Sequence, residues 1–438
     1  MTLTLSKPSI LNQPTIKTLS NGLTIIAEQM PVEAVNLNIW LNVGSAIEAD
    51  EINGMAHFLE HMVFKGTPSL KVGEFERLIE ERGAVTNAAT SQDYTHYYIT
   101  TAPQDFASLA PLQLDVVLNA SINNDDFERE KLVVLEEIRR SEDNPRRRTF
   151  YRAMKTGFPN LPYSRPVLGD FNIIENLKSQ QMRDFHNYWY SPSSMTAAVV
   201  GNLPVDELIE IVVDSFNNHS QNLNSDSLQE KHPLQSPFPI AHNYSENPFT
   251  EIVRQEYIDK SLQQARLIMM WRVPGMNKLD QTYGLDVLAV ILGQGKTSRL
   301  FRDLREDRGL VTQIGVSNMT QDLQGIFYIS ATLPSENIPQ VEKEIIKHIK
   351  KIQEELVDNN DIMRIRNQVT NHFIFSNERP SDRTNLYGYY YSQLGNLDYA
   401  LNYPSLLQSI EAKDLQMAAQ KYLNLNAYGM VTVKPETD

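Results

Sequence analysis

Two histidines and a glutamate lie within five residues of this chain, in the order His57-Phe58-Leu59-Glu60-His61. If this segment is helical, His57 and His61 are one turn apart and their imidazoles leave the same face. Two neutral imidazoles so placed can take two positions of a tetrahedral zinc ion. Glu60 lies on that face too, where a carboxylate can accept a proton from a metal-activated water. A helix with two surface histidines is the alternative that these five residues leave open.

The residues around this pattern predict the helix itself and the strand that precedes it. The turn residues Asn53 and Gly54 come before the helix, and Gly66 follows it. Apolar and polar residues alternate from Val35 to Val43, which predicts a half-buried strand. Residues 15–30 predict a hairpin around Ser20-Asn21-Gly22.

A second helix is predicted from Asp125 to Arg140, with acidic residues at its start and basic residues at its end. Glu130 and Glu137 are seven residues apart and therefore share one face. In an ordinary helix such acids are simply solvated.

Small side chains predominate from Ala84 to Thr90, which predicts a strand that includes Asn87-Ala88-Ala89-Thr90. Such a strand at the edge of a sheet would let an extended peptide pair with its backbone. An interior strand packed under a helix fits the pattern equally well.

The composition limits which metal ligands and nucleophiles the chain can use. The chain has no cysteine, which excludes disulfides, thiolate zinc sites and cysteine nucleophiles, so any metal must be held by histidine and carboxylate side chains. The net charge of −14 argues against nucleic acid as a partner and would suit basic ligands. We expect no membrane span and, without a recognisable signal sequence, a cytoplasmic location.

The length of 438 residues predicts more than one domain. A stretch rich in Asn, Ser, Gln and Pro divides the chain nearly in half. We therefore expect an N-terminal domain over residues 1–222, a linker over 223–247 and a C-terminal domain over 248–438.

The second half repeats the first. Arg82-Gly83-Ala84-Val85-Thr86 returns as Arg308-Gly309-Leu310-Val311-Thr312, each time after a helix of mixed charge and before strands. The predicted helix over residues 283–292 has no histidine, so a single metal site is expected, in the first half. The fold class expected is α+β, with two duplicated domains, each a mainly antiparallel β-sheet with helices packed on it.

The segment from Gly54 to Thr67 resembles the active-site segment of the pitrilysin/insulinase family of zinc peptidases, also called inverzincins after their His-x-x-Glu-His order. Within that family it is most similar to the β subunit of mitochondrial processing peptidase and its bacterial homologues. The resemblance covers nearly the whole chain, including residues 87–90, Leu135-Glu136-Glu137-Ile138 and Val200-Gly201-Asn202.

The resemblance implies roles for individual residues. It implies that His57, His61 and Glu137 hold one Zn²⁺ per chain, with Glu60 as general base and Glu130 as a supporting carboxylate. It implies a strand for the substrate at Asn87, Ala88, Ala89 and Thr90. The family's Arg/Tyr pair, seven residues apart, matches Arg383 and Tyr390 less firmly, because an aromatic helix face packed in the core explains these residues equally well.

The resemblance also implies assembly and substrate. Relatives of this length form dimers that enclose extended or unfolded peptides, and each zinc site faces the C-terminal domain of the other chain. Because Arg383 and Tyr390 are both present, a homodimer is expected before a heterodimer with an inactive homologue. Basic peptides would suit the acidic chain, and the source is expected to be bacterial. The alternative is a non-catalytic structural or partner subunit of the same fold, which typically loses metal ligands.

Overall fold

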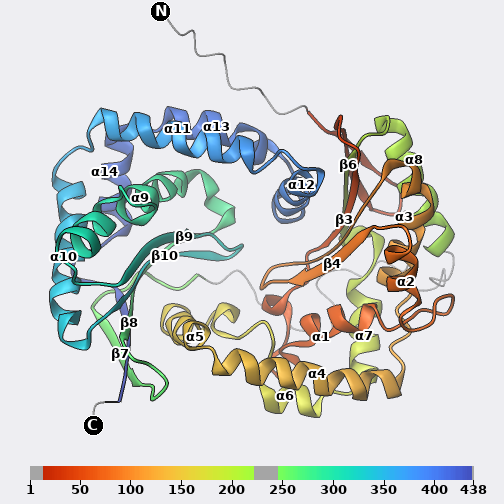
Figure 1. Ribbon diagram of the computed structural model, residues 1–438, viewed down its shortest axis with the longest axis horizontal. Coiled ribbons are helices and arrows are strands. Elements are labelled where there is room, and N and C mark those ends of the chain that lie inside the picture. Colours follow the sequence, from red (N-terminus) through yellow and green to blue (C-terminus); the bar gives the residue numbers. More distant parts are fainter. Residues whose placement is uncertain (1–12, 221–244, 437–438) are drawn as a thin grey trace, which may run out of the picture. The chain divides into compact units, whose positions relative to one another are not determined.

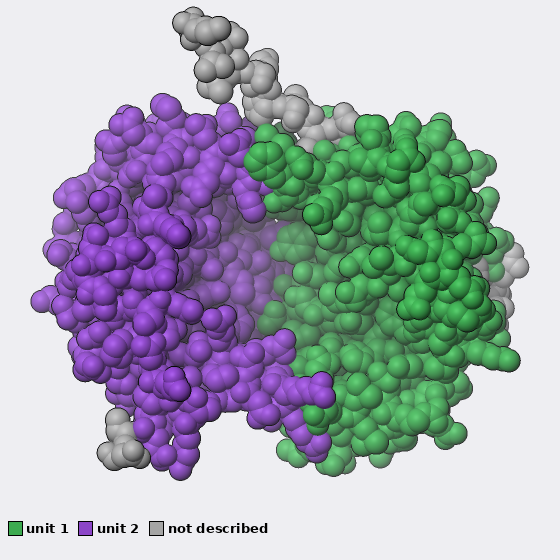
Figure 2. Space-filling view, viewed as in Figure 1, with its two compact units in different colours: residues 1–138, 166–241, 374–402 green, residues 139–165, 242–373, 403–438 purple. Residues whose placement is uncertain are grey.

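A computed structural model describes residues 13–220 and 245–436. The chain forms two compact units, which Figure 2 shows in different colours. Unit 1 comprises residues 1–138, 166–241 and 374–402, and unit 2 comprises 139–165, 242–373 and 403–438. Most of the predicted linker lies outside the described residues.

These units differ from the predicted sequence domains in two segments. Residues 139–165 belong to unit 2 and residues 374–402 belong to unit 1, so each half of the sequence supplies a helical segment to the unit formed mainly by the other half. Composition alone predicts that each domain is one continuous stretch of sequence. A helix, however, packs on the sheet face that buries its apolar side chains, even when the other half of the sequence forms that sheet.

The sheet of unit 1 has the strand order β1-β2-β6-β3-β5-β4. All neighbours are antiparallel except β2 and β6. Its strands are β1 (Thr15–Thr18), β2 (Thr24–Gln29), β3 (Val35–Leu41), β4 (Val85–Thr90), β5 (Thr95–Thr101) and β6 (Met195–Gly201). The predicted hairpin is therefore formed by β1 and β2.

Helices cover this sheet. Those of unit 1 are α1 (Met55–Val63), α2 (Glu74–Glu80), α3 (Pro103–Leu118), α6 (Phe171–Asn176), α7 (Ser179–Trp189), α8 (Val205–Ser220) and α12 (Pro380–Leu394), with short 3-10 turns η1 (Ser45–Ile47), η2 (Asp50–Ile52) and η4 (Pro192–Ser194). The helices α4 (Asn124–Asp143), α11 (Asn359–Phe375) and α13 (Asp398–Ser409) cross from one unit to the other. Among the described residues, no helix is long and apolar enough to cross a membrane.

The sheet of unit 2 has the order β7-β11-β8-β10-β9, again with one parallel pair, β7 and β11. Its strands are β7 (Val253–Ile258), β8 (Ala265–Pro274), β9 (Gln313–Met319), β10 (Gln324–Leu333) and β11 (Gly429–Lys434). Its helices and turns are α5 (Pro145–Gly157), η3 (Pro162–Ser164), η7 (Met276–Gln281), α9 (Tyr283–Gly293), η8 (Phe301–Asp307), η9 (Ser335–Asn337), α10 (Ile338–Glu354) and α14 (Ala412–Tyr422).

The two sheets share one plan. Without β1, the order β2-β6-β3-β5-β4 in unit 1 corresponds strand by strand to β7-β11-β8-β10-β9 in unit 2, including the position of the parallel pair. Helix α1 packs on β4 and β5, and α9 packs on β9 and β10 (Figure 1). The predicted fold class, two duplicated α+β domains with mainly antiparallel sheets, is confirmed.

The strand β3 is more buried than its alternating sequence predicts. Every residue of β3 is buried, including Asn36 and Asn38, because α12 packs across β3 and β6. Asn36 accepts a hydrogen bond from Thr384, and Asn38 donates one to Asn385 at 2.8 Å. The polar positions therefore pair with a helix from the end of the chain instead of facing water.

Candidate active site

Helix α1 is held at its N-terminus by a buried glutamate. Glu48 accepts hydrogen bonds from the backbone amides of Gly54 and Ala56, each at 2.7 Å, and from the side chain of Asn53 at 2.9 Å. A carboxylate at this position accepts hydrogen bonds from backbone amides that have no partner within the helix. Its negative charge also lies at the positive end of the helix dipole. Gly54 has a φ of +96°, and a Cβ on it would lie 2.7 Å from the Cα of Gly169, so only glycine fits this turn.

The structure brings His57, His61 and Glu137 together. Oε2 of Glu137 on α4 lies 3.7 Å from Nε2 of His57 and 3.5 Å from Nε2 of His61. One ligand atom from each of these residues lies within 4.8 Å of the other two. Tetrahedral zinc with bonds of about 2.0–2.1 Å needs ligand atoms roughly 3.3 Å apart, so these residues could hold zinc with small side-chain movements.

Glu130, one heptad before Glu137 on α4, contacts the second histidine. Its Oε1 is 3.0 Å from Nδ1 of His61, and its Oε2 is 2.8 Å from Nζ of Lys65. A carboxylate on the far nitrogen fixes the ring orientation and presents Nε2 to a metal. By contrast, Nδ1 of His57 is buried with no hydrogen-bond partner among the described residues.

Glu60 is held beside this group by the neighbouring strand. Oγ1 of Thr90, the last residue of β4, donates a 2.5 Å hydrogen bond to Oε2 of Glu60. Burial raises the pKa of Glu60, although the bond from Thr90 and the nearby His61 act in the opposite direction. A carboxyl in such surroundings is a stronger proton acceptor than an exposed one.

The two imidazoles have different electrostatic surroundings. Burial, with His61 nearby, lowers the pKa of His57 to about 4, which favours the neutral ring that binds metal. Burial would also lower the pKa of His61, but hydrogen bonds to Glu130 and Glu137 raise it to about 9. The carboxylates around His61 therefore favour a cation at this point, and a zinc ion meets that requirement.

The strand over residues 87–90 lies within β4, the last strand in its sheet, so its outer edge pairs with no other described strand. Asn87 and Ala89 are exposed, whereas Ala88 and Thr90 are half-buried. The sequence left open an edge strand or an interior strand, and in the structure β4 is an edge strand. Thr90 joins this edge directly to Glu60.

Arg383 and Tyr390 lie on α12 within unit 1. Arg383 forms an ion pair with the buried Glu28 of β2, at 3.0 Å to both carboxylate oxygens, and also contacts Tyr387 and the carbonyl of Asn377. Tyr390 packs partly buried against a small apolar cluster that includes Tyr387. The described hydrogen bonds of Arg383 therefore tie α12 to its sheet, and contact of this pair with substrate stays a prediction.

Two positioning residues were not singled out from the sequence. Glu48 belongs to the acidic loop Glu48-Ala49-Asp50-Glu51 before the helix, and its capping role depends on the loop geometry. Lys65 follows His61 by four residues, but its ion pair with Glu130 depends on where α4 lies. No short pattern in the sequence marks either role.

Comparisons with known proteins agree with this geometry. The family described as Insulinase (Peptidase family M16) matches residues 23–170, and the family described as Peptidase M16 inactive domain matches residues 176–369. An uncharacterized zinc protease of Rickettsia felis is 26% identical over 407 residues, covering 93% of this chain and 94% of that protein. An uncharacterized zinc protease of Mycobacterium leprae is 30% identical over 336 residues, 76% of this chain and 72% of that protein.

Among solved structures, a protease from Helicobacter pylori matches with a TM-score of 0.86 and 26% identity, covering 96% of this chain and 99% of that one. The metal group lies within the residues that match the insulinase family. Helix α9, which has no histidine, lies within those that match the inactive-domain family. With a His-His-Glu group on this fold and zinc proteases as its relatives, the chain belongs to the insulinase (M16) family of peptidases.

Proposed function

We propose that the chain is a zinc-dependent endopeptidase that hydrolyses extended or unfolded peptides. The observation that carries this proposal is the convergence of His57, His61 and Glu137 within 4.8 Å, with Glu60 on the same helix held by Thr90. Three protein ligands leave one position of a tetrahedral zinc open, which is the arrangement of catalytic sites. One zinc ion per chain, when bound, would supply an activated water and polarise the scissile carbonyl.

The chain's own residues then carry the proton. Glu60 accepts a proton from the attacking water, whose oxygen adds to the carbonyl carbon of the peptide. Glu60 next donates that proton to the leaving nitrogen as the carbon–nitrogen bond breaks. Glu130 holds His61 in orientation during this cycle, and Lys65 keeps Glu130 ionised.

The outer edge of β4 supports binding of the peptide as an added strand. Backbone pairing there would recognise an extended chain without regard to most side chains. Because Thr90 both ends this edge and bonds Glu60, a paired peptide would have its backbone close to the base. A homodimer is proposed before a heterodimer, since Arg383 and Tyr390 are present on the same chain as the ligand set.

The test is cleavage of a peptide mixture, mapped by mass spectrometry, with purified wild type and Glu60→Gln at equal zinc content. Wild type should cut, and Glu60→Gln should retain zinc yet cut far more slowly. Equal cutting by both proteins would contradict the proposal. A zinc-free wild type without activity would instead favour the non-catalytic subunit.

Matched variants on α4 separate the ligand from its neighbour. Glu137→Gln should lose most of its bound zinc, whereas Glu136→Gln should bind zinc as wild type does, because consecutive helical residues point about 100° apart. Zinc is measured by elemental analysis after dialysis. Size-exclusion chromatography with light scattering on the same samples tests whether active protein is a homodimer.

A further inference from the structure

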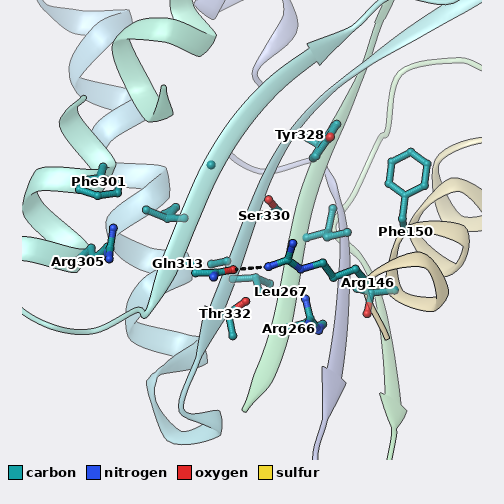
Figure 3. A pocket seen from close by; sticks show the side chains of 15 residues that line it. Arg146, Phe150, Arg266, Leu267, Phe301, Arg305, Gln313, Tyr328, Ser330 and Thr332 are labelled. Atoms are coloured by element: carbon teal, nitrogen blue, oxygen red, sulfur yellow. Dashed lines mark hydrogen bonds between the residues drawn. The ribbon is translucent and has the colours of Figure 1, made fainter. Parts of the chain in front are cut away.

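A cavity of about 550 Å³ lies in unit 2, on the face of the sheet formed by β8, β9 and β10 and flanked by α5 and η8. Figure 3 shows its lining, which includes the three arginines Arg146, Arg266 and Arg305. No carboxylate side chain is among the lining residues, although the whole chain carries a net charge of −14. A cavity with excess positive charge in an acidic protein is a local feature that a ligand can use.

The three guanidinium groups are only partly satisfied by the protein. Arg146 donates to the neutral amide oxygen of Gln313 at 3.2 Å. Nε of Arg266 is buried with no hydrogen-bond partner among the described residues. Arg305 stacks on Phe301, 4.6 Å from the ring centroid, and within the described part of the chain it pairs with the neighbouring Glu306 at 3.8 Å. Donor capacity therefore remains on guanidinium groups of residues that line the cavity.

The carboxylate that acts on Arg266 does not neutralise this group. Asp259 is bound by Arg148, with Oδ2 2.6 Å from Nη2. Burial lowers the pKa of Arg266, and Arg146 and Arg148 lower it further, while Asp259 offsets only part of this effect. An anion bound in the cavity would relieve both the desolvation and the mutual repulsion of these cations.

The rest of the lining describes the ligand's other features. The half-buried hydroxyl side chains Tyr328, Ser330 and Thr332 follow at every second position of β10 and so share one face (Figure 3). Buried aliphatic side chains, among them Leu267 and Ile314, also line the cavity. A carboxylate attached to an apolar group suits such a lining, because arginine binds carboxylates through paired hydrogen bonds.

We propose that this cavity binds a carboxylate of a peptide, either the C-terminal carboxylate or an acidic side chain, through Arg146, Arg266 and Arg305. The inference rests on the proposed function in one respect, namely that peptides are the chain's ligands. It adds an acid-selective site to a protein whose overall charge predicts a preference for basic peptides.

The experiment is calorimetric titration of zinc-loaded Glu60→Gln protein, which is not expected to consume the ligand, with three short peptides of one apolar sequence. The first has a free C-terminal carboxylate, the second has a C-terminal amide, and the third is the amide with one internal Glu. We expect the first or the third to bind about tenfold more tightly than the second, since only these two bring a charged acceptor to the guanidinium donors and tenfold corresponds to about 1.4 kcal/mol. Preference for the first identifies the C-terminus, and preference for the third identifies an acidic side chain.

In the Glu60→Gln protein, a further Arg266→Gln or Arg305→Gln substitution should weaken binding of the preferred acidic peptide by about tenfold and leave binding of the amide peptide unchanged. The matched control is Arg302→Gln on η8, an exposed arginine outside the lining, which should change neither. Arg305 is exposed on the same turn, so its variant provides a folded test if Arg266→Gln unfolds.

Equal binding of the three peptides would overturn the proposal, and so would wild-type affinity in both cavity variants. Failure of the proposed function is a separate result. Wild-type protein would then cleave none of the peptides, while selective binding of the acid to Glu60→Gln protein persisted.

Discussion

Helices α1 and α9 occupy corresponding places on two sheets of the same strand order, yet their polar residues differ. Glu60 lies 22 residues before Arg82, and Asp286 lies 22 residues before Arg308 in the repeated sequence. On the same count, Tyr283 and Val287 stand where His57 and His61 stand in unit 1. Unit 2 thus keeps a carboxyl at the place of the base and lacks the imidazoles.

The two carboxyls are also held in similar ways. Thr90 at the end of β4 donates to Glu60, and Asn318 in β9 donates to Asp286 at 2.8 Å. Burial raises the pKa of Asp286 to about 6, although the bond from Asn318 acts against this. The comparison teaches that a half-buried, hydrogen-bonded acid on this helix is a feature of the fold, and that the histidines and Glu137 make the metal group.

The largest effect is expected when the two carboxyls, Glu60 and Asp286, are neutralised in separate variants. Glu60→Gln should lower kcat by about 10²–10⁴-fold, because a general base contributes that much to proton transfer. Asp286→Asn, the same change on α9, should leave kcat unchanged. Steady-state cleavage of a quenched peptide measures both, and a comparable loss in Asp286→Asn would show that unit 2 takes part in the chemistry.

The exchanged helices offer a second comparison. Arg383 of α12 pairs with Glu28 of β2, and Arg148 of α5 pairs with Asp259, which follows the corresponding strand β7. Arg383→Met should cost about 3–5 kcal/mol of unfolding free energy, because it removes the cation from the 3% exposed Glu28 and leaves, among the described residues, only the Tyr387 hydroxyl bonded to it. Arg148→Met should cost less, since its pair is more exposed. Urea denaturation of the two variants measures the difference, and equal costs would contradict this ranking.

Glu130 is a carboxylate that orients a ligand, and its removal should have a smaller effect than loss of the base. Glu130→Gln should lower zinc affinity or activity by about 10–100-fold, as loss of an outer-shell partner of a metal ligand does. Glu128→Gln, an exposed acid on the same helix paired with Lys131, is the control. Competition with a chelator gives the affinity, and equal affinities in the two variants would remove the positioning role.

The smallest effect concerns stability and pH in unit 2. Because the folded-state pKa of Asp286 is raised from 3.8 to about 6, its favourable contribution is complete below about pH 4 and lost as pH rises through about 6. Asp286→Asn cannot ionise and should be more stable than wild type at pH 8 by on the order of 2 kcal/mol. At pH 4 the two should be equal. Urea denaturation at both pH values tests this, and a constant difference would show that Asp286 does not titrate.

Local patterns were sufficient for a large part of the fold. The hairpin, the duplicated halves and the helix over His57 follow from periodicity and turn residues, which depend on neighbours a few positions away. The histidine spacing on α1 is likewise local, because one helical turn separates positions 57 and 61. The family resemblance, in turn, supplied Glu137, which spacing alone could not distinguish from a solvated acid.

The sequence by itself determined the order of residue types, the periods of the elements and the repeat, and hence two similar α+β units with one set of histidines. Only the tertiary structure decided that residues 139–165 and 374–402 join the opposite units, that β3 is buried on both faces, and that Arg383 pairs with Glu28. The physical reason is that periodicity shows which face of an element is apolar. Which distant element covers that face depends on packing and ion pairing between residues hundreds of positions apart.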